Sequence, residues 1–167
     1  MVRALVFLGT LLSFFTSCSA QVSSGSYNAM LKTLLKHSVP EITVDSLEKC
    51  IGNVILLDAR ELAEYNVSHI TGARHVGYDN FSMQTVAGIA KDRHIVVYCS
   101  VGYRSEKITE KLKAAGFTQV SNLYGGIFEW VNQGNKVVDN SGKPTTKVHA
   151  YSKTWGVWLT RGEKVYQ

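Results

Sequence analysis

Residues 94–115 read HIVVYCSVGYRSEKITEKLKAA, and this stretch decides the fold. The apolar run 94–98 is typical of a strand buried on both faces of a sheet. Beyond it, apolar residues recur at helical spacing, which predicts a helix over 104–115. The sequence therefore predicts a strand, a short turn and a helix, with Cys99 at the end of the strand.

The turn after Cys99 is suited to hold an anion. Gly102 can adopt backbone angles closed to other residues, so that successive N–H groups point into one concavity. Together with the positive end of the helix dipole, such a concavity stabilises a thiolate. We therefore predict that Cys99 is a nucleophile. The anion-binding loop would consist of the residues that follow it, Ser100, Val101, Gly102, Tyr103, Arg104 and Ser105.

Four ordered motifs resemble those of the rhodanese-like sulfurtransferases. The first is the cysteine followed by x-x-Gly-x-Arg at 99–104. Residues 58–60, DAR, resemble the family's Asp-x-Arg motif, and residues 125–130, GGIFEW, its closing Gly-Gly-x-x-x-Trp motif. Residues 68–73, SHITGA, resemble its Gly-His-Ile-Pro-Gly-Ala motif, with serine and threonine in place of the first glycine and the proline. Both departures lie in a connecting loop remote in sequence from Cys99, so they concern loop geometry more than chemistry.

The resemblance implies a sulfurtransferase that needs no cofactor and no metal. Cys99 would take a sulfane sulfur from an anionic donor, thiosulfate or a persulfide, and pass it to a thiol, to cyanide or to a protein acceptor. Arg104 would either hold the donor or form a salt bridge that ties the loop to the domain. No lysine or arginine lies between Cys99 and Arg104, which predicts weak activity with thiosulfate.

Two other functions stay open at this point. Phosphatases that share this type of fold separate their cysteine and arginine by five residues, whereas four lie between Cys99 and Arg104 here. The smaller loop suits one sulfur atom better than a phosphoryl group. The other alternative is a non-catalytic or sulfur-carrying rhodanese-like binding module.

Three further residues are candidates for supporting the pocket. Asp58 and Arg60 are expected to form a buried ion pair at the pocket floor, and Arg60 could face the substrate. The resemblance places His69 in a loop with structural hydrogen bonds, rather than in a dyad with Cys99.

The remainder of the chain alternates between strand and helix patterns, which predicts an α/β fold, a rhodanese-like parallel sheet flanked by helices on both faces. The expected strands are 41–44, 54–57, 73–76, 94–98 and 119–122, and further helices are expected at 27–37 and 83–90 and from Asp45. The predicted organisation is a signal peptide at 1–20, a tether and helix at 21–40, the rhodanese-like domain at 41–134 and an extension packed on it at 135–167.

The N-terminus predicts export. Arg3 precedes the apolar stretch 4–15 and then small residues, as in a signal peptide. Cleavage after Ala20 competes with a lipoprotein reading in which Cys18 is acylated. We expect a periplasmic protein anchored to the membrane by a lipid at Cys18, with a Ser-rich tether over 21–25.

Other features are expected to be structural. Cys50 shares an apolar helix face and is interpreted as a buried core residue rather than a partner for Cys99. The aromatic residues of 135–167 are expected to pack the extension against the domain, and the alternative is that the extension overhangs the Cys99 pocket or docks a partner. The net charge of +5 comes without basic runs or zinc-ligand spacing, so we expect no nucleic-acid binding.

Overall fold

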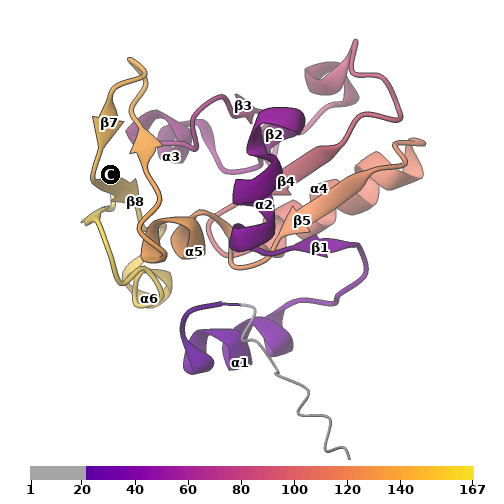
Figure 1. Ribbon diagram of the computed structural model, residues 1–167. Coiled ribbons are helices and arrows are strands. Elements are labelled where there is room, and N and C mark those ends of the chain that lie inside the picture. Colours follow the sequence, from indigo (N-terminus) through magenta and orange to yellow (C-terminus); the bar gives the residue numbers. More distant parts are fainter. Residues whose placement is uncertain (1–21) are drawn as a thin grey trace, which may run out of the picture.

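Five short strands form one parallel sheet in the order β1-β5-β4-β2-β3 (Figure 1). The computed structural model describes residues 22–167. The predicted α/β fold with a parallel sheet is confirmed. The strands are β1 Glu41–Ile42, β2 Ile55–Asp58, β3 Arg74–His75, β4 Ile95–Tyr98 and β5 Val120–Leu123.

The central strand β4 explains why its sequence is apolar throughout. It pairs with β2 on one side and β5 on the other, and all four of its residues are buried. Val96 and Tyr98 point into one hydrophobic core, while Val97 and Cys99 point into the other. A strand covered on both faces has no solvent-facing side to carry polar residues.

Helices cover both faces of the sheet. One core contains residues of α1 (Gly25–Leu34), α2 (Val44–Cys50) and α5 (Gly126–Asn132). The opposite core contains Ile108 and Leu112 of α4 (Tyr103–Ala114), together with Val86 of the 3-10 turn η2 (Met83–Val86). A second 3-10 turn, η1 (Ile51–Asn53), follows α2, and α3 (Leu62–Val67) follows β2.

Three expected helices have different bounds in the structure. The helix predicted over 83–90 is only η2, because β-branched Thr85 and Val86 favour helix weakly and Gly88 has φ +80°. The first helix begins two residues earlier than expected and ends at Leu34 rather than at residue 37. The helix expected from Asp45 begins at Val44, because the Thr43 side chain caps it by accepting from Ser46 N.

The tether predicted over 21–25 is wrong for the residues that the structure describes. Val22 is 1% exposed and belongs to the core. The Ser23 N–H and hydroxyl both donate to the buried Glu129 carboxylate, at 2.7 and 3.2 Å. The chain is therefore bound to the domain from Val22 onward, whereas the signal peptide and Cys18 lie outside the described residues.

The C-terminal extension packs against the domain through several small elements. An antiparallel pair, β6 (Val137–Val138) and β7 (Pro144–Thr145), precedes a parallel pair, β8 (Lys147–His149) and β9 (Glu163–Val165). The short helix α6 (Lys153–Gly156) lies between the latter two in sequence, and Figure 1 shows it near α5. Beyond it, Trp158 stacks on Tyr27 of α1 with ring centroids 5.4 Å apart.

Cys50 packs against the core as predicted, but it is half-buried rather than buried. Its thiol donates to the Ser46 carbonyl. Cys50 and Cys99 are both free thiols. Within residues 22–167, no helix combines the length and the apolar character that crossing a membrane requires.

Candidate active site

Cys99 comes directly after β4 and is 1% exposed. Its sulfur accepts a hydrogen bond from the Gly102 N–H at 3.2 Å. Gly102 has φ +117°, a conformation that L residues with side chains rarely adopt, so a glycine is needed to aim this amide at the sulfur. The same residue precedes α4, whose positive N-terminal end therefore lies beside the thiol.

The start of α5 holds the backbone of the loop. Ile127 N donates to the Cys99 carbonyl at 2.9 Å, and Phe128 N donates to the Ser100 carbonyl at 3.1 Å. Gly126 lies so close that a Cβ atom there would approach the Cys99 carbonyl oxygen to 2.4 Å. The closing Gly-Gly motif thus fixes the position of the cysteine loop from the neighbouring strand-helix connection.

Ser105 has one hydroxyl proton and three possible acceptors. Its oxygen lies 2.7 Å from Asn122 Oδ1, 3.1 Å from the Gly102 carbonyl and 3.5 Å from the Cys99 sulfur. The shortest contact favours Asn122, because O–H···O bonds are commonly 2.7–2.8 Å long. Gly102 N–H is therefore the principal donor to the thiol in this state.

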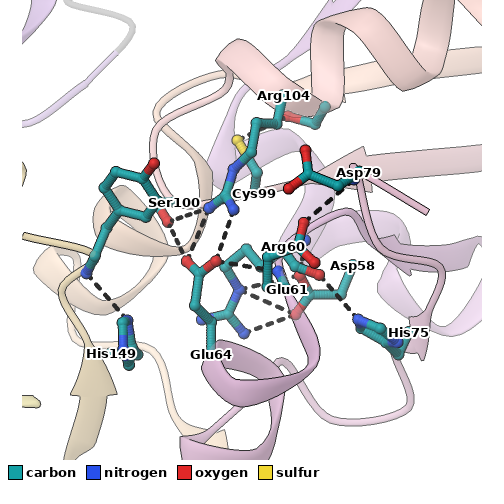
Figure 2. Close-up of polar contacts among 12 residues, drawn as sticks. Asp58, Arg60, Glu61, Glu64, His75, Asp79, Cys99, Ser100, Arg104 and His149 are labelled. Carbon is teal, nitrogen blue, oxygen red and sulfur yellow. Dashed lines mark hydrogen bonds and ion pairs between the residues drawn. The ribbon is translucent and has the colours of Figure 1, made fainter. Parts of the chain in front are cut away.

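Arg104 forms an ion pair with Glu64 (Figure 2). Its two terminal nitrogens donate to the two Glu64 oxygens at 2.6 and 2.8 Å, and one also donates to the Ser100 hydroxyl at 3.0 Å. Burial alone would raise the pKa of Glu64, but the hydrogen bonds and charge of Arg104 hold that pKa below its usual value. Of the two roles predicted for Arg104, the structure has the salt bridge that ties the loop to the domain.

Sequence reasoning missed Glu64, although a signal was present. Glu61 and Glu64 form a capping box at the start of α3, in which the Glu64 carboxylate accepts from Glu61 N at 3.0 Å. Acidic residues three positions apart before a helical stretch are typical of such a start. The capping box holds Glu64 in place to receive Arg104.

Asp58 and Arg60 form the predicted ion pair. The prediction that this pair lies at the pocket floor is wrong, because neither residue lines the cavity. Both side chains have no exposed surface, and Arg60 donates to Asp58 and to the Ser68 carbonyl, each at 2.6 Å. Arg60 therefore does not face the substrate. His69 also lies away from the cavity, stacked on Tyr65 at 3.9 Å and with its Nδ1 3.1 Å from the Tyr65 carbonyl.

The cavity at Cys99 has a volume of about 520 Å³, within the range of small-molecule sites. Tyr103, a member of the predicted anion-binding loop, lines the cavity and is 41% exposed. Leu34 of α1, to which sequence reasoning gave no role, also reaches it. Tyr151 and Trp155 of the extension reach it as well, in agreement with the alternative in which the extension overhangs the Cys99 pocket. The lining consists of Leu34, Glu61, Tyr78, Asp79, Cys99, Ser100, Val101, Tyr103, Arg104, Tyr151 and Trp155.

Tyr151 is held over the loop by its backbone. It has φ +63°, unusual for a residue with a side chain, and its N–H donates to His149 Nδ1 at 3.1 Å. Burial lowers the pKa of His149, so the neutral ring remains available as an acceptor. The Tyr151 ring lies 5.1 Å from the Arg104 guanidinium carbon, within cation–π range.

Within residues 22–167, no group of three or more histidine, cysteine, aspartate or glutamate side chains is placed to hold a metal ion. The site therefore consists of a thiol, backbone amides, an internal ion pair and aromatic walls.

Comparisons with known proteins agree with the motifs. The family model described as Rhodanese-like domain matches residues 43–133. The chain is 35% identical over 79 residues to the "Probable adenylyltransferase/sulfurtransferase MoeZ" of Mycobacterium tuberculosis, covering 47% of this chain and 20% of that protein. It is 38% identical over 80 residues to a "tRNA uridine(34) hydroxylase" of Listeria welshimeri, covering 45% and 25%. The chain thus spans about a fifth to a quarter of the length of these relatives.

Among solved structures, the chain is similar to the Rhodanese-like domain of an Anabaena sp. protein. The TM-score is 0.56 at 26% sequence identity, and the match covers 60% of this chain and 79% of that domain. The matched family region ends before the extension that supplies Tyr151 and Trp155 to the cavity.

Proposed function

Because this chain belongs to the rhodanese-like domain family, we propose that it is a sulfurtransferase that carries a sulfane sulfur as a persulfide on Cys99. The observation that carries the proposal is the position of the thiol. Its sulfur lines a cavity, receives the Gly102 N–H and lies beside the N-terminus of the 12-residue helix α4. These donors stabilise negative charge on sulfur without a general base.

Sulfur transfer through Cys99 takes two displacement steps. The Cys99 thiolate attacks the outer sulfur of thiosulfate or of an organic persulfide, forms a new S–S bond and releases sulfite or a thiolate. Cyanide or a thiol then attacks the outer sulfur of the Cys99 persulfide, the Cys99 S–S bond breaks, and thiocyanate or a new persulfide leaves. This is a ping-pong scheme with one covalent intermediate.

Mass spectrometry of the purified protein tests the proposal. Incubation with thiosulfate or a small persulfide should add one sulfur to Cys99, and cyanide should remove it as thiocyanate. Cys99→Ser should abolish both events. Cys50→Ser is the matched control, because this half-buried thiol lies outside the cavity and its loss should leave both events in place. An unmodified Cys99 after incubation with both donors would refute the proposal.

Phosphate chemistry is disfavoured by the same geometry. The ion pair with Glu64 compensates the charge of the Arg104 guanidinium and holds both of its terminal nitrogens, which weakens it as a site for a dianionic phosphoryl group. We expect negligible hydrolysis of an aryl phosphate.

A protein that takes up sulfur on Cys99 but does not turn over would instead be a sulfur carrier.

We further propose that the protein is exported and anchored to the membrane through an acylated Cys18. The support is the sequence of residues 3–20. Cys18→Ala should release the protein from the membrane fraction or block its maturation, without changing the sulfur chemistry of the folded domain. A mature periplasmic chain that begins at Gln21 would exclude the anchor.

A further inference from the structure

The cavity has two features that sulfur transfer to cyanide or thiosulfate does not require. Its charged wall is acidic, and much of the remaining wall is aromatic. Its volume of about 520 Å³ also leaves space for an organic group beside the reacting sulfur. These features concern the substrate rather than the nucleophile.

We propose that the thiol or persulfide that exchanges sulfur with Cys99 carries an apolar body and a positively charged group. This inference rests on the proposed sulfurtransferase function and names the chemical class of its organic substrate. Such a substrate differs from thiosulfate, because its only negative charge is on the reacting sulfur.

The charges of the lining support a cationic group. Glu61, Asp79 and Arg104 are the lining residues with ionisable acid or base side chains, apart from Cys99 and the tyrosines. The charge of Arg104 is matched by its ion pair with Glu64. Among the described residues, neither Glu61 nor Asp79 takes part in an ion pair, so two carboxylates are left to face an incoming substrate.

The two carboxylates lie together in the lining of the cavity that also contains Cys99. Glu61 caps α3, and its Oε1 accepts from Asp79 N at 3.3 Å, so the two residues lie together. In Figure 2 both are drawn on the opposite side of Arg104 from His149. Because Cys99, Glu61 and Asp79 line the same cavity, the anionic sulfur of a substrate can meet the Gly102 amide while a cationic group on the same molecule meets the carboxylates.

The aromatic wall supports an apolar body. Tyr78, Tyr103, Tyr151 and Trp155 reach the cavity together with Leu34 and Val101. Tyr151 and Tyr103 are 52% and 41% exposed, so their rings are accessible from solution. Aromatic faces bind cations and bury apolar groups, and both properties suit the same substrate.

The transfer step needs no additional oxidant or reductant. A substrate thiolate, R–S⁻, attacks the outer sulfur of Cys99–S–SH. The R–S–SH bond forms, the Cys99 S–S bond breaks, and Cys99 leaves as the thiolate, while the proton stays on the outer sulfur. The reverse step loads Cys99 from R–S–SH, so one binding site serves donor and acceptor.

The experiment compares three acceptors of one shape on protein whose Cys99 is already loaded with sulfur. The probes are benzyl thiols with a para aminomethyl, methyl or carboxylate group, and each rate is divided by the rate of the same thiol with a small persulfide in solution. We expect the aminomethyl thiol to react about tenfold faster than the carboxylate thiol, with the methyl thiol between them, and this preference to shrink at high salt. Equal normalised rates, or a faster carboxylate thiol, would overturn the inference.

Three variants, one of them a control outside the cavity, assign the effect to the cavity. Asp79→Asn should reduce the preference about threefold, whereas Asp92→Asn, which removes an exposed carboxylate before β4 at the opposite end of the strand, should leave it unchanged. Tyr151→Gly keeps the positive φ and removes the ring, so it should bring the aminomethyl benzyl thiol closer in rate to 2-aminoethanethiol, which lacks an apolar body.

The outcomes separate the two proposals. If Cys99 cannot be loaded, sulfur transfer itself is refuted. If Cys99 loads but shows no charge preference, or if Asp92→Asn changes the preference as much as Asp79→Asn, only the substrate class is refuted.

Discussion

Asp58–Arg60 and Glu64–Arg104 are the same kind of ion pair, a carboxylate with an arginine fork, and each has a nitrogen–oxygen contact of 2.6 Å. The first pair joins residues two positions apart and has no exposed surface. The second joins residues forty positions apart, and its side chains are 4% and 13% exposed. Position in the fold, rather than chemistry, therefore distinguishes them.

The difference in position gives the pairs different roles. Asp58–Arg60 fixes the turn after β2 and holds the Ser68 carbonyl, so it belongs to the folding of the domain. Glu64–Arg104 links α3 to the first turn of α4, and its Arg104 lines the cavity. It also places a carboxylate against the positive charge of Arg104 beside Cys99, which is the basis of the substrate class proposed above.

The largest expected effect comes from breaking the fully buried pair. Arg60→Met leaves the Asp58 carboxylate buried without its cation, which should lower the free energy of unfolding by about 3–5 kcal/mol. Urea unfolding measures this loss. Arg74→Met, on the exposed part of neighbouring β3, is the control and should change stability by less than about 0.5 kcal/mol. A loss below about 1 kcal/mol for Arg60→Met would contradict the assigned role.

Breaking the second pair should cost less stability and change the chemistry. Glu64→Gln removes the charge-assisted hydrogen bonds to Arg104, which should lower the free energy of unfolding by about 1.5–3 kcal/mol. The loss is smaller than for Arg60→Met because the partly exposed Arg104 can still be hydrated. The substitution also frees a permanent positive charge at the cavity, so sulfur loading of Cys99 from thiosulfate should become about threefold faster or more. Loading rates and urea unfolding are measured on the same variant. Slower thiosulfate loading by a folded Glu64→Gln protein would show that the pair does not mask Arg104.

The pH dependence of stability should also report on the second pair. The pKa of Glu64 is lower in the folded protein than its usual value, so the stabilisation from its ionised form is complete above the unfolded-state pKa of about 4.3. It is lost as the pH falls through the lowered folded-state pKa. Unfolding measured between pH 7 and pH 3 should therefore show an acid-induced loss that is smaller in Glu64→Gln. Identical acid profiles for the two proteins would exclude this contribution.

The smallest effect is expected from a pair on the surface. Lys107 Nζ and Glu110 Oε1 are 2.7 Å apart, nearly as close as in the other two pairs, but their side chains are 21% and 36% exposed. Solvent screening limits such pairs, so Lys107→Met should change the free energy of unfolding by less than about 1 kcal/mol. Its effect should fall further with added salt, unlike that of Arg60→Met. A loss as large as that of Glu64→Gln would mean that distance matters more than burial.

The parts of the fold that the sequence predicted are those encoded over short distances. The strand 95–98, Cys99 and the glycine turn follow one another, so periodicity and turn chemistry were enough to identify them. The Asp58–Arg60 pair could be inferred for the same reason. The sequence could not show that this pair lies outside the cavity, because the exposure of a side chain depends on the helices and loops that pack over it.

The missed parts depend on residues far apart in the chain. No local pattern connects Glu64 with Arg104, although the capping box marks Glu64 as part of a helix start. The Ser-rich segment resembled a tether because its binding partner, Glu129, lies more than a hundred positions away. Tyr151 and Trp155 have no periodicity that points them toward Cys99, so the sequence offered their place over the pocket only as an alternative.

The stack of Tyr27 on Trp158 has a practical consequence for dissecting this protein. These rings come from opposite flanks of the region that matches the family, residues 43–133. Trimming the chain to that region would remove both rings, and trimming one flank would leave the other ring without its partner. The boundary at which sequence similarity ends is therefore not the boundary at which the folded unit ends. Tyr27 and Trp158 join the two flanks to each other, so any shortened version of the protein should keep both flanks.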